Sequence, residues 1–440
     1  MEGFKVKKRS WAMGLVLLMV AVLVLSACGK SGVKGADSTA SAQPTADSTA
    51  TAEPQKDVDL RVINFRVEDQ AYYDEVNKKF EEKYPYIHVK YDAAPTKDWG
   101  NLKTSRIATN DVDVVGGQTP DAKDPNAASL WLDLKGQPFL DGYIEGALKG
   151  GQSNDGTQYL LPSNSVSVVT FYNKKIFADL GLAIPKTWDE FIAACDKIKA
   201  AGIDPIMFGG KDQWPVVMQV MGIEMGANRS SNPDFFAQLK DGKTKFTDPA
   251  MLDVFTKYEK MTNYFQKNAA GLDYGQAPAL FAQGKAAMMV DGSWSTSQIV
   301  DAKPAFEVGA FLTPGGNTAE ANAIAPTKIG SGFLIYKKSP NQDAALKYLA
   351  FLSEKDIYQQ YINAAKMWPV KSDTTLADPL SNEIAQLLGK QLPMWDSIQP
   401  TGANYNFVED AMKLLFKKTT PAEAVADMQK KFLDSKPDWK

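Results

Sequence analysis

The stretch from Val290 to Ser295 places a carboxylate, a turn signal and an indole ring next to one another. It reads Val-Asp-Gly-Ser-Trp-Ser and follows an apolar run. Asp-Gly-Ser favours a turn, and turns face water. Trp294 therefore either folds back into the core or lines a surface where a flat apolar group stacks on it. Asp291 either binds ligand hydroxyls or caps the turn.

Two further tryptophans pose the same choice between packing and binding. Trp214 follows one predicted strand and begins a predicted helix, and Trp395 lies in the carboxyl-terminal tail. An aromatic ring offers a large apolar face, and tryptophan adds an N–H donor at its edge. Each ring is a candidate for the core and for a ligand site alike.

The elements that must position these groups begin with an alternation of strands and helices. Strands are predicted at 60–65, 86–92 and 112–117, and the helices between them start near residues 70 and 96. This order implies a parallel sheet covered on both faces, with ligands beyond the carboxyl ends of its strands. Polar residues stand at those ends, where the alternative is a solvated loop, namely Arg66, Glu68, Asp69, Gln118 and Asp121.

A second parallel α/β unit is predicted further along the chain. A strand at 165–173 precedes a helix that Thr187 caps, with Glu190 completing a capping box. Another strand is predicted at 202–209, and a helix has Pro249 in its first turn. The block 279–294 reads as a short helix, a glycine break and a strand, and the tail from Ser381 to Leu433 as mostly helical.

Composition excludes several classes of function. The chain has 440 residues, a net charge of −3, one histidine and two cysteines. His88 lies in a strand-like stretch and Cys195 on a predicted helix, so neither metal binding nor a catalytic triad is expected unless the lone histidine is the base. Interspersed charges predict no nucleic-acid surface. No phosphate-binding loop motif occurs, and we expect no enzyme activity, cofactor or metal.

The amino terminus is typical of an exported lipoprotein. Basic residues precede a fifteen-residue apolar run from Trp11 to Leu25, which is short for a membrane span. Leu-Ser-Ala-Cys then resembles the bacterial lipobox, which predicts a signal peptide at 1–27 and lipid on Cys28. The alternatives are an ordinary secretory signal and a simple membrane anchor. Residues 28–57 are rich in Ser, Thr and Ala and predict a disordered linker.

Four stretches in order resemble the family 1 extracellular solute-binding proteins, the sugar-binding components of bacterial ABC importers. They are Pro162 with Phe-Tyr-Asn-Lys-Lys-Ile-Phe after it, the region 181–206, the block 280–294 and the region 331–356. Phe-x-x-Gly-Lys-Ala-Ala-Met followed by Gly-Ser-Trp is the most specific. The resemblance covers most of residues 58–440.

The resemblance implies an α/β, two-lobed, periplasmic-binding-protein-like fold. A ligand cleft lies between the lobes, and the chain crosses between them three times, near residues 165, 312 and 367. The expected amino-terminal lobe is 58–164 plus 313–366, and the carboxyl-terminal lobe is 165–312 plus 367–440. Closure of the lobes around ligand would then present the protein to its membrane permease.

The resemblance also adds candidate ligand contacts. The family commonly places a stacking aromatic where Trp294 stands, which favours the binding interpretation of that residue. Asn164 and Trp368 lie at expected crossings, and Tyr405 aligns with a tail aromatic that contacts sugar in the maltodextrin-binding member. Gly116-Gly117 and Val166 replace aromatic residues and a carboxylate of that member, which disfavours a long maltodextrin.

The predicted function is capture of a mono- or oligosaccharide by a monomer anchored outside the cell membrane, for delivery to an ABC importer. Aromatic planes suit the apolar face of a sugar ring, and carboxylates, amides and Arg66 suit its hydroxyls. The runner-up ligand is a polyol, polyamine or peptide. A glycan-acting enzyme would need two carboxylates at one committed site, and a structural adhesin would show no ligand-induced closure.

Overall fold

The computed structural model describes residues 56–395 and 407–435, which belong to one compact unit, Gln55–Lys440. The predicted α/β class is confirmed. The described strands form a nine-stranded sheet system in the order β2-β1-β3-β8-β4-β6-β5, with β7 paired to β4 and β9 to β8.

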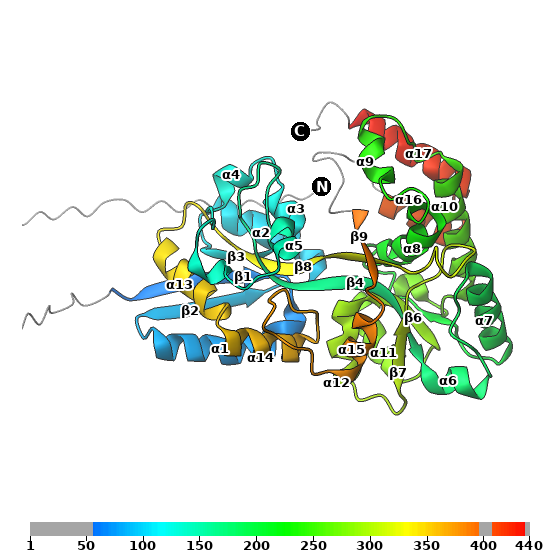
Figure 1. Ribbon diagram of the computed structural model, residues 1–440, viewed down its shortest axis with the longest axis horizontal. Helices are drawn as coiled ribbons and strands as arrows, with labels where there is room; N and C mark the ends of the chain where they lie inside the picture. Colours follow the sequence, from blue (N-terminus) through cyan, green and yellow to red (C-terminus); the bar gives the residue numbers. More distant parts are fainter. Residues whose placement is uncertain (1–55, 396–406, 436–440) are drawn as a thin grey trace, which may run out of the picture. The chain divides into compact units, whose positions relative to one another are not determined.

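The first strands form the predicted parallel unit. β1 (Val58–Asn64) pairs in parallel with β2 (Ile87–Ala93) and with β3 (Val114–Gly117), and α1 (Gln70–Lys83) and α2 (Thr96–Ala108) connect them. In Figure 1, α1 and α2 lie on opposite faces of these strands. The unit is not purely parallel, because β3 pairs antiparallel with β8 (Ile324–Ile335).

Strand β4 (Leu161–Asn173) joins two groups of strands, as Figure 1 shows. Its residues 161–167 pair with β8, and its residues 168–173 pair antiparallel with β6 (Met288–Gly292) and β7 (Val308–Phe311). β5 (Ile206–Met207) pairs in parallel with β6. The prediction of a second parallel unit is therefore wrong for β4. The periodicity of the side chains and the order of the elements along the chain do not determine the direction in which two strands pair.

The local signals read from the sequence set several helix ends. Thr187 caps α7 (Trp188–Ala200) and forms a capping box with Glu190, and Pro249 opens α10 (Pro249–Met261). The tail is helical as predicted in α15 (Pro379–Ala385), α16 (Phe407–Leu415) and α17 (Pro421–Asp434). It also contains β9 (Lys390–Pro393), which pairs with β8 and was not predicted.

The remaining helices cover the strands and carry the loops between them. Their bounds are α3 (Thr119–Ala122), α4 (Ala127–Leu130), α5 (Glu145–Gly150), α6 (Lys174–Asp179), α8 (Val216–Glu224), α9 (Phe235–Lys240), α11 (Ala277–Ala282), α12 (Thr296–Asp301), α13 (Gln342–Leu352) and α14 (Lys355–Ala365). A short π-helix, Met225–Arg229, continues α8. Within the described ranges, no helix has the length and apolar character needed to cross a membrane.

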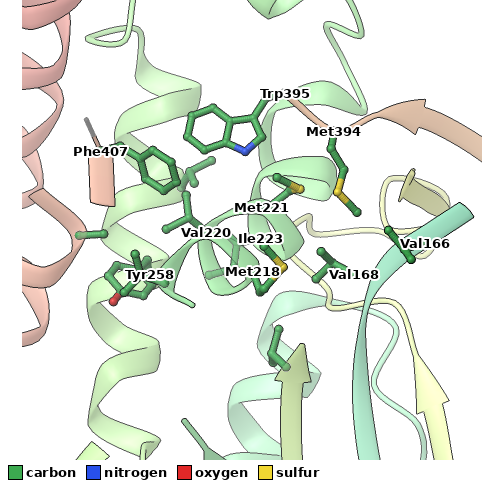
Figure 2. Close-up of a cluster of buried hydrophobic side chains, with 14 of the residues drawn as sticks. Val166, Val168, Met218, Val220, Met221, Ile223, Tyr258, Met394, Trp395 and Phe407 are labelled. Carbon is green, nitrogen blue, oxygen red and sulfur yellow. The ribbon is translucent and has the colours of Figure 1, made fainter. Parts of the chain in front are cut away.

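A large hydrophobic cluster surrounds Trp395, just after β9. Its ring centroid lies 5.5 Å from that of Phe236 and 4.0 Å from that of Phe407, and Val220 and Met221 of α8 lie below it (Figure 2). Such contacts bury a large apolar area, and each buried Å² contributes roughly 25 cal/mol to the free energy of folding. This Trp395 cluster is part of the main core.

Candidate functional site

Three rings from separate segments form an aromatic cluster, defined as Trp214, Tyr274 and Trp294. The Trp214 ring lies edge-on to Tyr274, with centroids 4.5 Å apart, and its centroid is 6.4 Å from that of Trp294. The indole Nε1 of Trp294 donates to the Tyr274 hydroxyl at 2.5 Å. All three rings are half-buried, so the cluster keeps part of its aromatic surface accessible.

The Trp294 ring is also held by its close approach to the backbone of Gly292. It follows β6 in a short 3-10 turn, Ser293–Ser295, and a Cβ atom on Gly292 would lie 2.2 Å from its ring carbons. Only a residue without a side chain permits this approach. The ring therefore folds back over its own strand without entering the core completely.

Asp291 is the polar support of the aromatic cluster. It is the fourth residue of β6 and is buried, with 3% of its surface exposed. Its carboxylate accepts from the Gly292 N–H at 2.7 Å, the Ser295 hydroxyl at 2.8 Å and the Tyr274 hydroxyl at 3.3 Å. Burial raises the pKa of Asp291 to about 7, against these hydrogen bonds. The carboxylate thus holds the turn; a contact with ligand stays a prediction.

A second group, the Arg66 cluster, consists of Arg66, Glu68, Asp69 and Tyr361. The Arg66 guanidinium donates to Asp69 at 2.5 and 3.0 Å and lies 3.0 Å from Glu68, and the Tyr361 hydroxyl donates to Asp69 at 3.4 Å. Burial opposes the Arg66 charge, yet the two carboxylates raise its pKa well above the ordinary value. The predicted strand-end acids and Arg66 are therefore neighbours at the end of β1.

Asn164 connects this cluster to the long strands. It is fully buried on β4, at an irregularity in the pairing with β8, and its amide nitrogen donates to Ser331 at 2.6 Å and to Tyr361 at 2.7 Å. A Cβ on Gly330 would lie 2.3 Å from its amide oxygen. Asn164 therefore holds the Tyr361 hydroxyl by a hydrogen bond, and none of its own surface is exposed.

Gln118 and Asp121 lie after β3 and mainly build the turn into α3. They form a capping box, and Gln118 also donates to the Gly330 carbonyl at 2.7 Å. Asp121 pairs with Lys103 of α2 at 2.5 Å. Both side chains thus have hydrogen-bond or ion-pair partners within the protein. A contact of either one with ligand stays a prediction.

One residue of the aromatic cluster, Tyr274, responds electrostatically to a residue of the Arg66 cluster. Burial is the main reason that the pKa of the Tyr274 hydroxyl lies well above its ordinary value, and the negative charges of Asp291 and Glu68 add to it. Burial likewise raises the pKa of Glu68, which Arg66 opposes. The charge of Glu68 therefore makes a small contribution to the pKa of Tyr274, after burial and Asp291.

The structure places the other predicted side chains elsewhere. Trp368 is buried in a hydrophobic cluster, where its Nε1 donates to the Ser381 carbonyl at 3.4 Å, and its backbone bridges to Ser165. Trp395 lies in the core described above. Tyr405 and Cys28 lie outside the described residues.

Sequence reasoning missed Tyr274, Tyr361 and a ring pair at the end of β1. Phe65 and Trp99 lie 5.7 Å apart between centroids, next to Arg66 in the chain and on α2. Tyr274 stands in Asp-Tyr-Gly-Gln, and an aromatic residue within a turn-forming stretch was the available signal. Tyr361 gave none, because it reads as the apolar face of a helix.

Two surface grooves flank these groups. One of about 310 Å³ is lined by Lys103, Asp121 and Trp131 among others. The other, of about 250 Å³, lies between the loop that precedes Trp214 and α16, and is lined by Gly210, Lys211, Gln213, Ala270, Glu409, Met412, Lys413, Phe416 and Lys418.

Metal-ligating side chains are not gathered at one place in the part of the chain that the structure describes. No cluster of three His, Cys, Asp or Glu residues that could hold a metal ion occurs there. Cys195 is buried, and burial raises the pKa of its thiol far above the ordinary value, so it is not a reactive thiolate.

The chain resembles known proteins in both sequence and fold. The model of the family described as bacterial extracellular solute-binding protein matches residues 66–359. The chain is 28% identical over 316 residues to a multiple sugar-binding protein of Streptococcus mutans, covering 69% of this chain and 73% of that one. It is 25% identical over 330 residues to a diacetylchitobiose binding protein of Streptomyces coelicolor, covering 72% and 74%.

Solved structures share the fold. A chitin oligosaccharide binding protein superposes with a TM-score of 0.75 at 26% identity, covering 87% of this chain and 99% of that chain. A raffinose complex of a solute-binding protein gives a TM-score of 0.75 at 22% identity, covering 86% and 99%, which shows the fold alone. These structures are two-lobed. The chain belongs to the bacterial extracellular solute-binding protein family.

Proposed function

We propose that this protein captures a mono- or oligosaccharide outside the cell membrane and delivers it to an ABC importer. The aromatic cluster carries the proposal. A partly accessible indole that a tyrosine hydroxyl and a close glycine hold in place is a rigid plane on which the apolar face of a sugar ring can stack. The sugar-binding relatives support the same ligand class.

The proposed site joins the aromatic cluster to the Arg66 cluster, with sugar between them. Trp294 and Trp214 supply the stacking surface, and Glu68 supplies an acceptor for hydroxyls. Asp291, Asp69 and Asn164 act by holding these groups, and Gln118 and Asp121 stay candidates at the rim. We leave Trp368 and Trp395 out because both are buried in hydrophobic clusters.

Binding would work by closure of two lobes, for which we keep the division 58–164 plus 313–366 and 165–312 plus 367–440. The change of partners along β4 and the bridge between Ser165 and Trp368 support crossings near 165 and 367. Sugar that contacts both lobes stabilises the closed form, because it binds that form more tightly. No step needs a cofactor, and a monomer suffices.

We further propose that lipid on Cys28 holds the protein at the outer face of the membrane. The lipobox-like Leu-Ser-Ala-Cys supports it, and two or more acyl chains give stable anchoring. Metabolic labelling with palmitate should mark the protein and fail on Cys28→Ser. Labelling that persists in the variant contradicts the anchor site.

The test of ligand class is a thermal-shift screen of the full chain in detergent against mono- and oligosaccharides, polyols, polyamines and short peptides. A sugar at one hundred times its dissociation constant should stabilise the protein by about 2.7 kcal/mol. A shift with polyols, polyamines or peptides alone would replace the carbohydrate by the runner-up ligand. Turnover of a bound sugar would revive the glycan-acting enzyme.

A further inference from the structure

Arg66 was expected to meet ligand hydroxyls, but its guanidinium is directed at protein carboxylates. Nε and Nη2 donate to Asp69, and Nη1 lies 3.0 Å from Glu68. A guanidinium has five N–H donors in a fixed fork, and each of its nitrogens here faces a carboxylate. The positive charge of Arg66 is therefore paired with carboxylates of the protein itself.

Glu68 is the charged group of this cluster that reaches solvent. Its side chain is 19% exposed, against 5% for Arg66 and 3% for Asp69. Behind Asp69 stand a hydroxyl and an amide, those of Tyr361 and Asn164, which add no charge. Two carboxylates against one guanidinium leave the cluster with a formal charge of −1 when both acids are ionised.

The groups near the Arg66 cluster include aromatic rings, a further carboxyl group and two paired lysines. The aromatic cluster contributes two indoles, a neutral phenol and the carboxyl of Asp291. Lys103 pairs with Asp121 at 2.5 Å, and Lys211 at the mouth of the second groove pairs with Asp273 at 2.9 Å. A ligand between the clusters would meet acceptors and aromatic faces, and Glu68 is the most exposed charged side chain of the Arg66 cluster.

We propose, building on the carbohydrate function proposed above, that Glu68 determines specificity by favouring neutral and amino sugars over sugars that carry a carboxylate. A carboxylate accepts hydrogen bonds from hydroxyl and ammonium groups, and repels an anion in a partly desolvated site. Arg66, Asp69 and Tyr361 are positioning residues that hold Glu68 in place.

The experiment compares the tightest-binding neutral sugar of the screen with its uronic acid, oxidised at C6, by calorimetric titration at pH 7. The wild-type full chain should bind the uronic acid about 10- to 100-fold more weakly. Glu68→Gln should reduce this ratio to about threefold or less, while the neutral sugar weakens only a few-fold. The ratio reports charge recognition and is insensitive to a general loss of folded protein.

The matched control is Glu82→Gln, which removes the same charge from an exposed position of α1. It should leave the ratio as in wild type. A uronic acid that binds as tightly as the neutral sugar overturns the inference, and so does an unchanged ratio in Glu68→Gln or an equal change in Glu82→Gln. If neither sugar of any pair binds, the proposed function fails first and the inference with it.

The second groove supplies a separate arm, because Lys418 lies over the Phe416 ring there, 5.4 Å from its centroid. Lys418→Ala should leave the preference for the neutral sugar unchanged. A wild-type preference for the uronic acid that disappears in Lys418→Ala would assign recognition to the groove and overturn the role of Glu68.

Discussion

Trp294 and Trp395 are the same residue type in two regions of one chain, and their surroundings differ. Trp294 is half-buried and bonded through its N–H to a tyrosine that a buried carboxyl supports. Trp395 is 5% exposed and packs against Phe236. It also packs against Phe407, as Figure 2 shows. The first ring is oriented by polar contacts and partly accessible, and the second is held by apolar packing.

Each region also contains a buried carboxyl group, and the hydrogen-bond partners of these two carboxyl groups differ. Asp291 accepts three hydrogen bonds. Glu224, which borders the Trp395 cluster, accepts from Asn228 at 3.0 Å. Burial raises the pKa of Asp291 to about 7 and that of Glu224 to about 8. The comparison separates a partly accessible tryptophan, which we propose as the sugar platform, from a tryptophan that is buried in the core.

The largest expected effect is on stability, from Trp395→Ala. Removing a buried indole should lower the free energy of unfolding by about 3–5 kcal/mol, because it leaves a cavity among apolar side chains. Urea denaturation of the full chain measures this. A loss below about 1 kcal/mol would show that Trp395 is not part of a packed core and would break the contrast with Trp294.

The second effect concerns Glu224 and pH. Its pKa in the folded protein, about 8, exceeds the ordinary value of 4.5, so the folded state holds the proton more tightly. Stability should therefore fall as pH rises from about 4.5 to 8. Glu224→Gln lacks this penalty and should be more stable than wild type by about 2–4 kcal/mol at pH 9, with a much smaller difference near pH 5. Equal stabilities of wild type and Glu224→Gln at both pH values would contradict the raised pKa of Glu224.

The third effect is on binding, from Trp294→Ala. Loss of the stacking plane should weaken sugar binding by about 2 kcal/mol, roughly 30-fold. The free energy of unfolding should change less than in Trp395→Ala, because Trp294 is only half-buried. Calorimetry gives the affinity and urea denaturation the stability, and unchanged affinity would reverse the assignment of the two tryptophans.

The smallest effect is expected from Tyr274→Phe, which keeps the ring and removes the hydroxyl that joins Trp294 to Asp291. The loss of these hydrogen bonds should cost about 1 kcal/mol of stability and a few-fold in affinity. Tyr274→Ala should weaken binding further, because Trp214 also loses its ring neighbour. Equal affinities for the two variants would show that the ring edge contributes nothing.

Much of the fold could be predicted because its signals are local. The alternation from β1 to β3, the Thr187 capping box and the helix that Pro249 opens are set by residues a few positions apart. The direction of β4 could not be predicted in this way, since its partners β6, β7 and β8 come from more than 100 residues further on. β9 is a four-residue edge strand with little periodicity.

The site was predicted less completely for the same reason. The strand pattern correctly placed Arg66, Glu68 and Asp69 just after the end of β1, but it did not indicate that Arg66 is buried. Tyr274 and Tyr361 acquire their roles from hydrogen bonds to residues distant in sequence or in another element. Whether a tryptophan is packed or accessible depends on such neighbours, which is why Trp294 and Trp395 looked alike in the sequence.

The most direct measurement titrates one sugar, the best hit of the screen, into wild type, Trp294→Ala and Trp395→Phe by calorimetry. The account predicts that Trp294→Ala remains folded and loses about 30-fold in affinity, while Trp395→Phe keeps an affinity within about threefold of wild type. Wild-type affinity in Trp294→Ala together with lost binding in a folded Trp395→Phe would contradict the central claim that the aromatic cluster is the sugar platform.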